Sequence, residues 1–154
     1  MNNEHIFRSQ LEWKKPSELI RGKEKNHTIS IAGKADLYIS AAKAFKGDLT
    51  LYNPEDLLLS SLTSCHMMSY LYCCQKNGLE ILEYNDQSEA ILKVNNDGSG
   101  KISQVILNPI VTIADLSQRD LALDLHKEAA QLCFIANSCN FEIMHHPTVV
   151  VRDL

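Results

Sequence analysis

Cysteine is the residue type in this sequence that is best suited to chemistry, because a thiolate attacks electrophilic atoms and forms disulfides. The chain of 154 residues contains five cysteines, namely Cys65, Cys73, Cys74, Cys133 and Cys139. An odd number of cysteines cannot pair completely within one chain, so at least one thiol must be free. Their positions along the sequence indicate which thiol can react.

Cys65 lies near the middle of a predicted helix, one turn away from Leu62 and Met68. These neighbours predict apolar surroundings, and burial among apolar groups raises the pKa of a thiol because it disfavours the charged thiolate. Chemistry at Cys65 therefore requires a cation close by. Without one, Cys65 would pack in the core as a small hydrophobic residue.

Cys133 directly follows a second predicted helix and is flanked by Leu132 and Phe134, so core packing is again the alternative to chemistry. Two cysteines on different helices can form a disulfide if their Cα atoms lie about 4.4 to 6.8 Å apart, a distance that the sequence does not give. The adjacent residues Cys73 and Cys74 point about 100° apart on a helix, which indicates ordinary packing.

The elements that must position these cysteines begin with a long helix. Asn53 suits a helix cap, Pro54 suits the first helical position, and the two acids that follow suit the positive end of the helix dipole. The helix should run to about Asn77, where Gly78 fits the left-handed residue that ends many helices. Apolar residues surround it on nearly all sides, which predicts a central helix covered by other elements.

A second helix is predicted from Ser117, which with Asp120 resembles a capping box, through about Gln131. Strands are predicted over the segments 7–13, 28–31, 36–40, 88–94, 102–113 and 141–151. Pro109 in the fifth of these segments indicates an edge strand or a bulge. Because strands and helices segregate along the chain, we predict an α+β fold with sheets on two long helices, in one domain that spans residues 1–154.

Several segments of the sequence resemble the OsmC/Ohr family of thiol peroxidases in their order and spacing. Residues 53–67, NPEDLLLSSLTSCHM, resemble the family's helix opening and peroxidatic-cysteine segment. Residues 125–138 contain LHKEA and CFIANS, which resemble its second-cysteine segment, and KNHTI at 25–29 and FKGD at 45–48 match one branch of the family. The resemblance covers about residues 25–150.

This resemblance implies a cysteine-based peroxidase that reduces organic hydroperoxides to alcohols. Cys65 would attack the peroxide as a thiolate and become a sulfenic acid, and Cys133 would condense with it to form a disulfide. An external dithiol, which in the family is often a dihydrolipoyl group, would reopen that disulfide. The family needs no metal or organic cofactor, and its chains form an intertwined homodimer in which antiparallel sheets enclose the central helices.

The resemblance also assigns the cation that an ionised Cys65 requires. Glu55 matches an acid that in the family holds an arginine against the cysteine, although an acid in a first helical turn also stabilises the helix dipole by itself. In this chain the arginine position is occupied by Lys25, and Arg21 lies four residues earlier on the same polar loop. Either Lys25 substitutes, or Arg21 reaches in, or turnover is weakened; a solvated surface role for both is the remaining alternative.

Composition argues against several other classes of protein. The formal net charge is −4 and the basic residues are scattered, so the chain has no basic stripe for nucleic acid. No segment approaches a membrane span or a secretory signal, and we expect a cytoplasmic protein. His145 and His146 are neighbours on a predicted strand and face opposite sides, which argues against a shared metal. A site from Cys65, His126 and Cys133 is conceivable, but no CxxC or HxxxH spacing supports zinc, and we expect His66 to be structural.

Two alternatives to peroxidase activity stay open. A redox sensor would form a reversible disulfide between Cys65 and Cys133 with little turnover, and the lysine in the arginine position keeps this interpretation open. A binding module would hold a hydrophobic ligand in an apolar pocket and have inert thiols. Cys139, which replaces the apolar residue usual in similar sequences, would be a spare thiol that competes with Cys133.

Overall fold

The computed structural model of the chain describes residues 3–18 and 20–152. Its secondary structure is of the α+β class, as predicted. The chain forms two compact units, which we call unit 1 (residues 1–57) and unit 2 (residues 58–154). The two proposed reactive cysteines both belong to unit 2, whereas the loop with the candidate cations belongs to unit 1.

Unit 1 is built on a small antiparallel sheet with the strand order β1-β2-β3. Its strands are β1 (Gln10–Glu12), β2 (His27–Ser30) and β3 (Leu37–Ile39), and a short 3₁₀ helix, η1 (Lys43–Phe45), follows them. These strands fall within one residue of the three predicted segments or inside them, and the single tryptophan, Trp13, lies directly after β1.

The loop after β3 depends on a glycine. A Cβ atom on Gly47 would overlap the backbone carbonyl of Ala41, so the chain can pass itself at this point only without a side chain. The loop so formed presents the Phe45 carbonyl to Lys25, whose Nζ donates to it at 2.8 Å. Asp48 of the same loop accepts from the Asn26 side chain at 3.3 Å.

The long helix α1 (Pro54–Lys76) begins and ends where the sequence predicts. Asn53 Oδ1 accepts from the backbone N–H of Asp56 at 2.9 Å, and Asp56 Oδ2 accepts from the backbone N–H of Asn53 at 3.2 Å. This reciprocal pair is a capping box, which satisfies amides that the helix leaves without an internal partner. At the other end Gly78 adopts a φ of 69°, the left-handed conformation that glycine accepts without strain.

Unit 2 contains two sheets of three strands each, in the orders β4-β7-β9 and β5-β6-β8. Their strands are β4 (Glu83–Asp86), β5 (Glu89–Val94), β6 (Gly100–Leu107), β7 (Pro109–Ile113), β8 (Glu142–His145) and β9 (Thr148–Val151). The predicted strand 102–113 is therefore two strands in two sheets, and so is 141–151. Pro109 and Pro147 stand at these two divisions, because proline lacks the N–H that would continue a ladder.

Both sheets of unit 2 are mixed, so the expectation of purely antiparallel sheets is wrong for this unit. The strands β6 and β8 pair in parallel, as do β7 and β9, whereas the other pairs are antiparallel. The parallel pairs arise because the intervening helices return the chain to the same end of the sheets before β8 begins.

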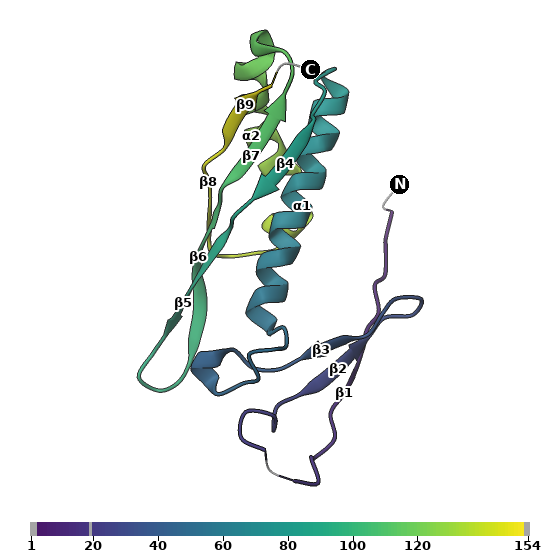
Figure 1. Cartoon of the computed structure of the whole chain (residues 1–154), viewed down its shortest axis with the longest axis vertical. Helices are drawn as coiled ribbons and strands as arrows, with labels where there is room; N and C mark the ends of the chain where they lie inside the picture. Colours follow the sequence, from purple (N-terminus) through teal and green to yellow (C-terminus); the bar gives the residue numbers. More distant parts are fainter. Residues whose placement is uncertain (1–2, 19, 153–154) are drawn as a thin grey trace. The chain divides into compact units, whose positions relative to one another are not determined.

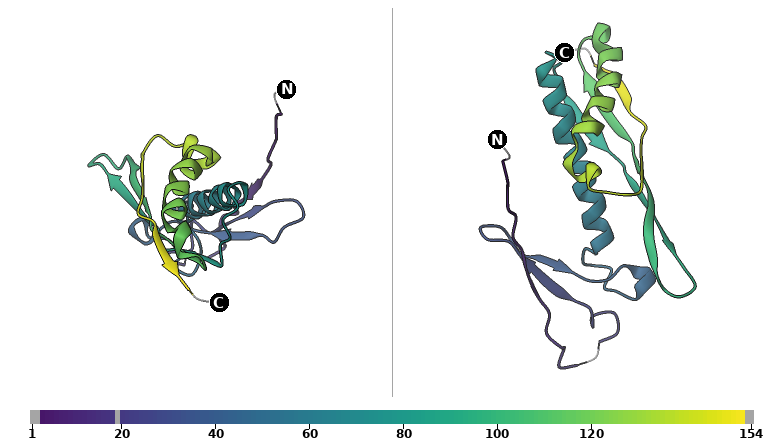
Figure 2. Two further views of the ribbon diagram at one scale, coloured as in Figure 1. Left: turned by 90° about the horizontal axis from the view of Figure 1, so that it is seen from above. Right: turned by 180° about the vertical axis from the view of Figure 1, so that it is seen from behind.

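The second predicted helix is α2 (Arg119–Leu132), which follows the 3₁₀ turn η2 (Leu116–Gln118) and precedes the single-turn helix α3 (Phe134–Asn137). The predicted cap at Ser117 is wrong: Asp115 Oδ1 accepts from the backbone N–H of Ser117 at 2.8 Å and opens η2 instead. Figure 2 shows α2 alongside α1 on one face of the sheets. Their buried side chains share a core with β7 and β9 that contains Tyr70, Val111, Ala122, Leu125 and Val149.

No helix in the described part of the chain is long and apolar enough to cross a membrane.

Figure 1 shows that α1 lies over the strands of unit 2, which cover one face of this helix. The helix buries Leu62, His66, Tyr70, Cys73 and Cys74, residues at helical spacing on one face. Its opposite face, with Met68 and Tyr72, is exposed in the single chain.

We predict that Gly47→Ala lowers the free energy of unfolding of unit 1 by about 1 to 3 kcal/mol, because the added Cβ forces two backbone segments apart. Urea titration followed by Trp13 fluorescence measures this, since the only tryptophan lies in unit 1 and donates to the Glu24 carbonyl at 3.0 Å. Ala32→Gly, at an exposed position of the same unit, is the control and should have little effect. An unchanged midpoint for Gly47→Ala would contradict the close approach at Ala41.

Candidate active site

The structure brings Cys65 and Cys133 together. Cys65 lies on α1, and Cys133 is the residue between α2 and α3, so the turn at the end of α2 determines where its thiol lies. Cys133 is almost fully buried, at 1% exposure, whereas Cys65 is partly exposed, and the two side chains lie close enough for Cys65 to raise the pKa of Cys133. Cys133 Sγ also caps α3, since it accepts from the backbone N–H of Ala136 at 3.4 Å.

The surroundings of Cys133 favour its protonated form. Burial, and then the neighbouring Cys65 side chain, raises the pKa of Cys133 to about 11, although the backbone amides of Ala136 and Ile135 act in the opposite direction. At neutral pH Cys133 is therefore a thiol rather than a thiolate. Its full burial distinguishes it from Cys65, which is partly exposed.

Cys65 opens into an apolar cavity of about 420 Å³. The other lining residues come from α1 and from the turn that carries Cys133, and they are Met68, Ser69, Tyr72, Leu132 and Phe134. Phe134 is 81% exposed in the single chain, so an apolar side chain lines the opening of the cavity. A small organic molecule with an apolar body would bury surface here while its reactive end meets Cys65.

The charged residues that the resemblance assigns lie in unit 1. Arg21 and Lys25 are exposed, and Lys25 Nζ is bound to the Phe45 carbonyl. Glu55 lies in the first turn of α1, and its Oε2 is buried with no hydrogen-bond partner among the described residues. Within the ranges that the structure describes, no ion pair joins Glu55 to either cation. A buried carboxylate oxygen without a partner is costly, and a cation would satisfy it.

The remaining cysteines fit ordinary packing. Cys73 and Cys74 are buried on the sheet-facing side of α1, and burial raises the pKa of Cys74 to about 11. Burial also raises the pKa of Cys73 and of Cys139. Cys139 packs against the small core around Leu62 and Val105. A raised pKa suppresses the thiolate, so all three react slowly at neutral pH.

Histidines from α1, α2 and β8 form a cluster that the sequence did not predict. His66 Nε2 and His126 Nδ1 are 3.1 Å apart and share a hydrogen bond. The His145 ring lies 4.4 Å from the His66 ring, and the Tyr70 ring stacks on His126 at 3.9 Å. The sequence held one signal: His66 and Tyr70 are four residues apart and so share a helix face. The opposite orientation of His145 and His146 was predicted, and His146 is exposed.

The histidines of this cluster are neutral at pH 7. Burial, and then the neighbouring rings, lowers the pKa of His66 to about 3 and that of His126 to about 4. Burial also lowers the pKa of His145, which Asp86 partly offsets. Neutral imidazoles can ligate metals, but no three His, Cys, Asp or Glu side chains in the described residues are arranged to hold an ion.

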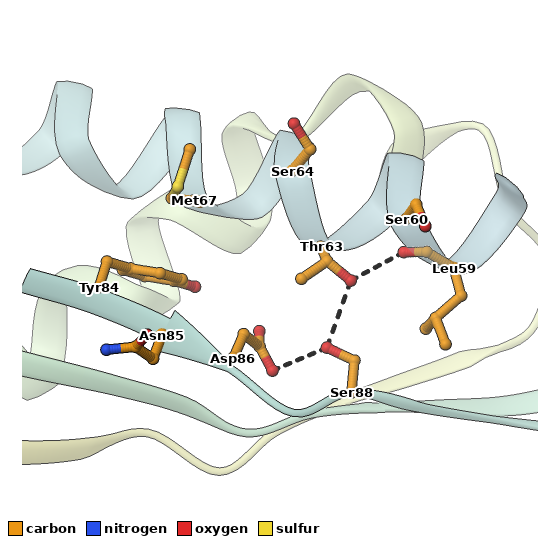
Figure 3. A pocket seen from close by; sticks show the side chains of 9 residues that line it. All are labelled: Leu59, Ser60, Thr63, Ser64, Met67, Tyr84, Asn85, Asp86 and Ser88. Carbon is orange, nitrogen blue, oxygen red and sulfur yellow. Dashed lines mark hydrogen bonds between the residues drawn. The ribbon is translucent and has the colours of Figure 1, made fainter. Parts of the chain in front are cut away.

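A second cavity, of about 540 Å³, lies between α1 and the connection from β4 to β5 (Figure 3). Its hydrogen bonds run from Thr63 to the Leu59 carbonyl at 2.8 Å, between Thr63 and Ser88 at 3.3 Å, and from Ser88 to Asp86 at 2.7 Å. The hydroxyl of Tyr84, which also lines it, is buried without a partner among the described residues. No lining residue is a cysteine, histidine or lysine, so thiol chemistry belongs to the cavity at Cys65.

Comparison with known proteins identifies similar chains. The family model described as OsmC-like protein matches residues 46–145. The uncharacterized protein YmaD of Bacillus subtilis is 30% identical over 103 residues, which cover 65% of this chain and 68% of that protein.

Solved structures show the same fold. An OsmC-like protein of unknown function from Vibrio cholerae superposes with a TM-score of 0.82 at 23% identity, over 94% of this chain and 99% of that one. An organic hydroperoxide resistance protein OsmC from Legionella pneumophila gives a TM-score of 0.74 at 15% identity, over 97% of this chain and 100% of that one. An organic hydroperoxide resistance protein from Elizabethkingia anophelis gives 0.73 at 15% identity, over 99% and 100%.

We predict that the protein loses stability as the pH falls from 7 towards 4.5. The unfolded histidines bind protons below about pH 6.5, whereas folded His66 and His126 do so only near pH 3 and 4. The unfolded state therefore takes up more protons in this window, and each such histidine removes up to about 1.4 kcal/mol per pH unit. Urea midpoints at pH 7, 5.5 and 4.5 measure the effect.

The variant His66→Gln removes one of these titrating groups and should flatten the decline. His146→Gln, at the exposed position directly after β8, is the matched control. It should leave the dependence of the urea midpoint on pH unchanged. A midpoint that does not change between pH 7 and 4.5 in the unmodified protein would contradict the buried, neutral cluster.

Proposed function

The chain belongs to the OsmC-like protein family, and from this premise we propose that it is a thiol peroxidase that reduces organic hydroperoxides to alcohols. One observation carries the proposal: a buried thiol, Cys133, lies beside Cys65, and Cys65 opens into an apolar cavity. Two sulfurs in contact, one of them accessible to an organic molecule, are what a two-cysteine peroxidase requires.

The reaction begins at Cys65. Its thiolate attacks the terminal oxygen of the hydroperoxide, the O–O bond breaks, and the alkoxide leaves and takes a proton to become the alcohol. Cys65 is then a sulfenic acid. The sulfur of Cys133 attacks the sulfur of Cys65, its proton leaves with the hydroxyl group as water, and a disulfide remains. An external dithiol supplies the two electrons that reduce this disulfide by exchange, and a dihydrolipoyl group has that chemistry.

The raised pKa of Cys133 separates the roles of the two cysteines. A thiol with a pKa of about 11 is a poor nucleophile at neutral pH, so Cys133 does not compete for the peroxide. A protonated thiol beside Cys65 can donate to a thiolate formed there and so stabilise its negative charge. It also lies within reach of Cys65 before the sulfenic acid forms, which favours the disulfide over further oxidation.

The apolar cavity supports an organic substrate. Met68, Tyr72 and Leu132 offer apolar surface and Ser69 a single hydroxyl, and each buried methylene group contributes about 0.8 kcal/mol to binding. Hydrogen peroxide has no apolar part and gains nothing from such a surface. The protein should therefore prefer hydroperoxides with an aromatic or aliphatic body.

We assign the cation to Lys25, with Glu55 as the group that holds it. Glu55 lies ten residues before Cys65 on α1, about 15 Å along the helix axis, so it acts on the thiolate only through an intervening side chain. Its buried Oε2 has no partner among the described residues, which is the situation that a cation would relieve. The Phe45 carbonyl occupies one of the three N–H donors of Lys25 and leaves two for other acceptors.

A homodimer is part of the proposal. Beside the cavity, Met68, Tyr72 and Phe134 are each more than half exposed in the single chain, which leaves an apolar surface that water disfavours. A second copy of the chain would cover it, and symmetric dimers are the commonest soluble assembly. The active sites would then lie where the copies meet.

A redox sensor is the second candidate, because a lysine ammonium lacks the planar fork with which arginine binds an oxygen bidentately. Such a sensor would form the same disulfide but would turn over slowly. A module that binds a hydrophobic ligand would leave Cys65 inert to peroxide. Both are distinguished from the peroxidase by the experiments that follow.

We predict that the reduced protein consumes cumene hydroperoxide faster than hydrogen peroxide in the presence of a dithiol, and that Cys65→Ser abolishes this activity. Cys133→Ser should still react once and accumulate a sulfenic acid at Cys65, which dimedone labelling and mass spectrometry detect. Cys73→Ser is the matched control on the same helix and should retain turnover. Full activity of Cys65→Ser would exclude the mechanism, and disulfide formation with negligible turnover would favour the sensor.

The cation assignment gives a separate prediction. Lys25→Met should lower kcat/KM for cumene hydroperoxide by about 10- to 100-fold, the effect of about 1.4 to 2.7 kcal/mol of lost transition-state stabilisation. Lys25→Arg should equal or exceed the unmodified protein, because guanidinium restores a bidentate donor. Arg21→Met, on the same loop, is the control. A loss in Arg21→Met together with normal rates in Lys25→Met would transfer the role to Arg21.

A further inference from the structure

The hydrogen bond between His66 and His126 joins α1, which carries Cys65, to α2, whose end is followed directly by Cys133. His66 lies on α1 and His126 on α2, and both side chains are almost fully buried, at 1% and 2% exposure. Because both rings are neutral, one nitrogen donates and the other accepts across the 3.1 Å between them. Either assignment of the proton gives the same link between the helices.

A second bond strengthens this link one helical turn away. The Tyr70 hydroxyl donates to the Ala122 carbonyl at 2.9 Å, and its ring stacks on His126. Tyr70 lies four residues after His66 on α1, and Ala122 lies four residues before His126 on α2. This is the pattern expected for two antiparallel helices. Two directional bonds at successive turns fix both the separation and the rotation of one helix relative to the other.

A further polar link between these helices in the described part of the chain is weak by comparison. Lys76 and Glu128 form an ion pair at 3.5 Å, but their side chains are 61% and 39% exposed. Water screens such a pair, and exposed ion pairs contribute little to stability. The buried ring pair therefore sets the geometry.

The hydrogen bond between His66 and His126 lies close in sequence to both cysteines. His66 follows Cys65 directly on α1, and His126 lies seven residues, about two turns, before Cys133 at the end of α2. Cys133 has no regular helix geometry of its own, because the chain turns there into the short α3. The end of α2 thus decides how closely the Cys133 thiol approaches Cys65.

The histidine pair lowers the free energy of unfolding relative to an apolar pair. This indicates that its role is to fix the orientation of the two helices rather than to stabilise the fold. His66 Nδ1 and His126 Nε2 are buried and have no hydrogen-bond partner in the described part of the chain. Two apolar side chains of similar size would fill the space without these orphaned nitrogens. A hydrogen bond in a core specifies one arrangement of its partners, which apolar contacts do not.

We propose that His66 and His126 are positioning residues, whose hydrogen bond holds the end of α2 against α1 and so keeps the Cys133 thiol in register with Cys65. The proposal deepens the proposed function and rests on it for its catalytic meaning. The bond itself exists whatever the protein reacts with.

The test uses His126→Leu, which keeps the bulk and removes the bond, and His126→Asn, whose amide places a polar atom near the position of Nδ1. Cys133 is buried, so its rate of alkylation by iodoacetamide in the reduced, full-length protein reports how often the end of α2 leaves α1. Peptide mass spectrometry separates this thiol from the other four. The second readout is the equilibrium constant of the Cys65–Cys133 disulfide in glutathione buffers.

We expect His126→Leu to speed alkylation of Cys133 about 3- to 10-fold, the factor to which one net hydrogen bond corresponds, and to weaken the disulfide by a similar factor. His126→Asn should restore most of both values. Val111→Ala, in the same core but outside the ring pair, is the control for general loosening and should leave both readouts near those of the unmodified protein.

Three results would overturn the proposal: His126→Leu labels like the unmodified protein, His126→Asn fails to rescue, or Val111→Ala labels as fast as His126→Leu at equal unfolding free energy. Failure of the proposed function looks different. If hydroperoxide produces neither turnover nor a disulfide while His126→Leu still speeds alkylation and His126→Asn reverses it, the function is rejected and the positioning role stands.

Discussion

The contact between the Cys133 thiol and the Cys65 sulfur is the interaction on which the rest of this structure's chemistry depends. A buried thiol is ordinarily inert because the surrounding apolar groups disfavour its ionised form. Here burial is unequal: Cys133 is enclosed and remains protonated, whereas Cys65 opens into a cavity. The difference in environment gives two identical side chains different chemical properties. In unit 2, the helix α1 supplies Cys65, and the turn after α2 supplies Cys133.

The helix α1 connects the levels of the structure. Its capping box determines where the helix begins. The face with Leu62, His66 and Tyr70 packs on the sheets and on α2. Cys65 and the cavity lie outside this buried face. One sequence segment therefore encodes a boundary, a packing surface and a reactive group at helical spacing. The helix is apolar on nearly all sides because one face packs in the core and another lines the cavity.

The sequence predicted the elements that depend on local chemistry and missed those that depend on distant partners. Asn53, Pro54 and Gly78 each act on their own helix, so both ends of α1 are confirmed. Ser117 was misassigned because the competing acceptor, Asp115, lies two residues earlier. The division of the strand 102–113 and the parallel pairings depend on which sheet each half joins, which no local pattern specifies. Among the site residues, the two cysteines were singled out by resemblance, but the pairing of His66 with His126 joins positions 60 residues apart and had no signal in spacing.

The capping role of Cys133 has a consequence for what oxidation does to the fold. The same sulfur that faces Cys65 also accepts the amide of Ala136 and so begins α3, a helix of only four residues. A short helix has little stability of its own and depends on its cap. A disulfide sulfur keeps both of its electron pairs, but the new bond to Cys65 would fix the direction in which they point. Oxidation would therefore change the geometry of the cap at the turn 134–137, and the amide of Ala136 would report the redox state of the pair.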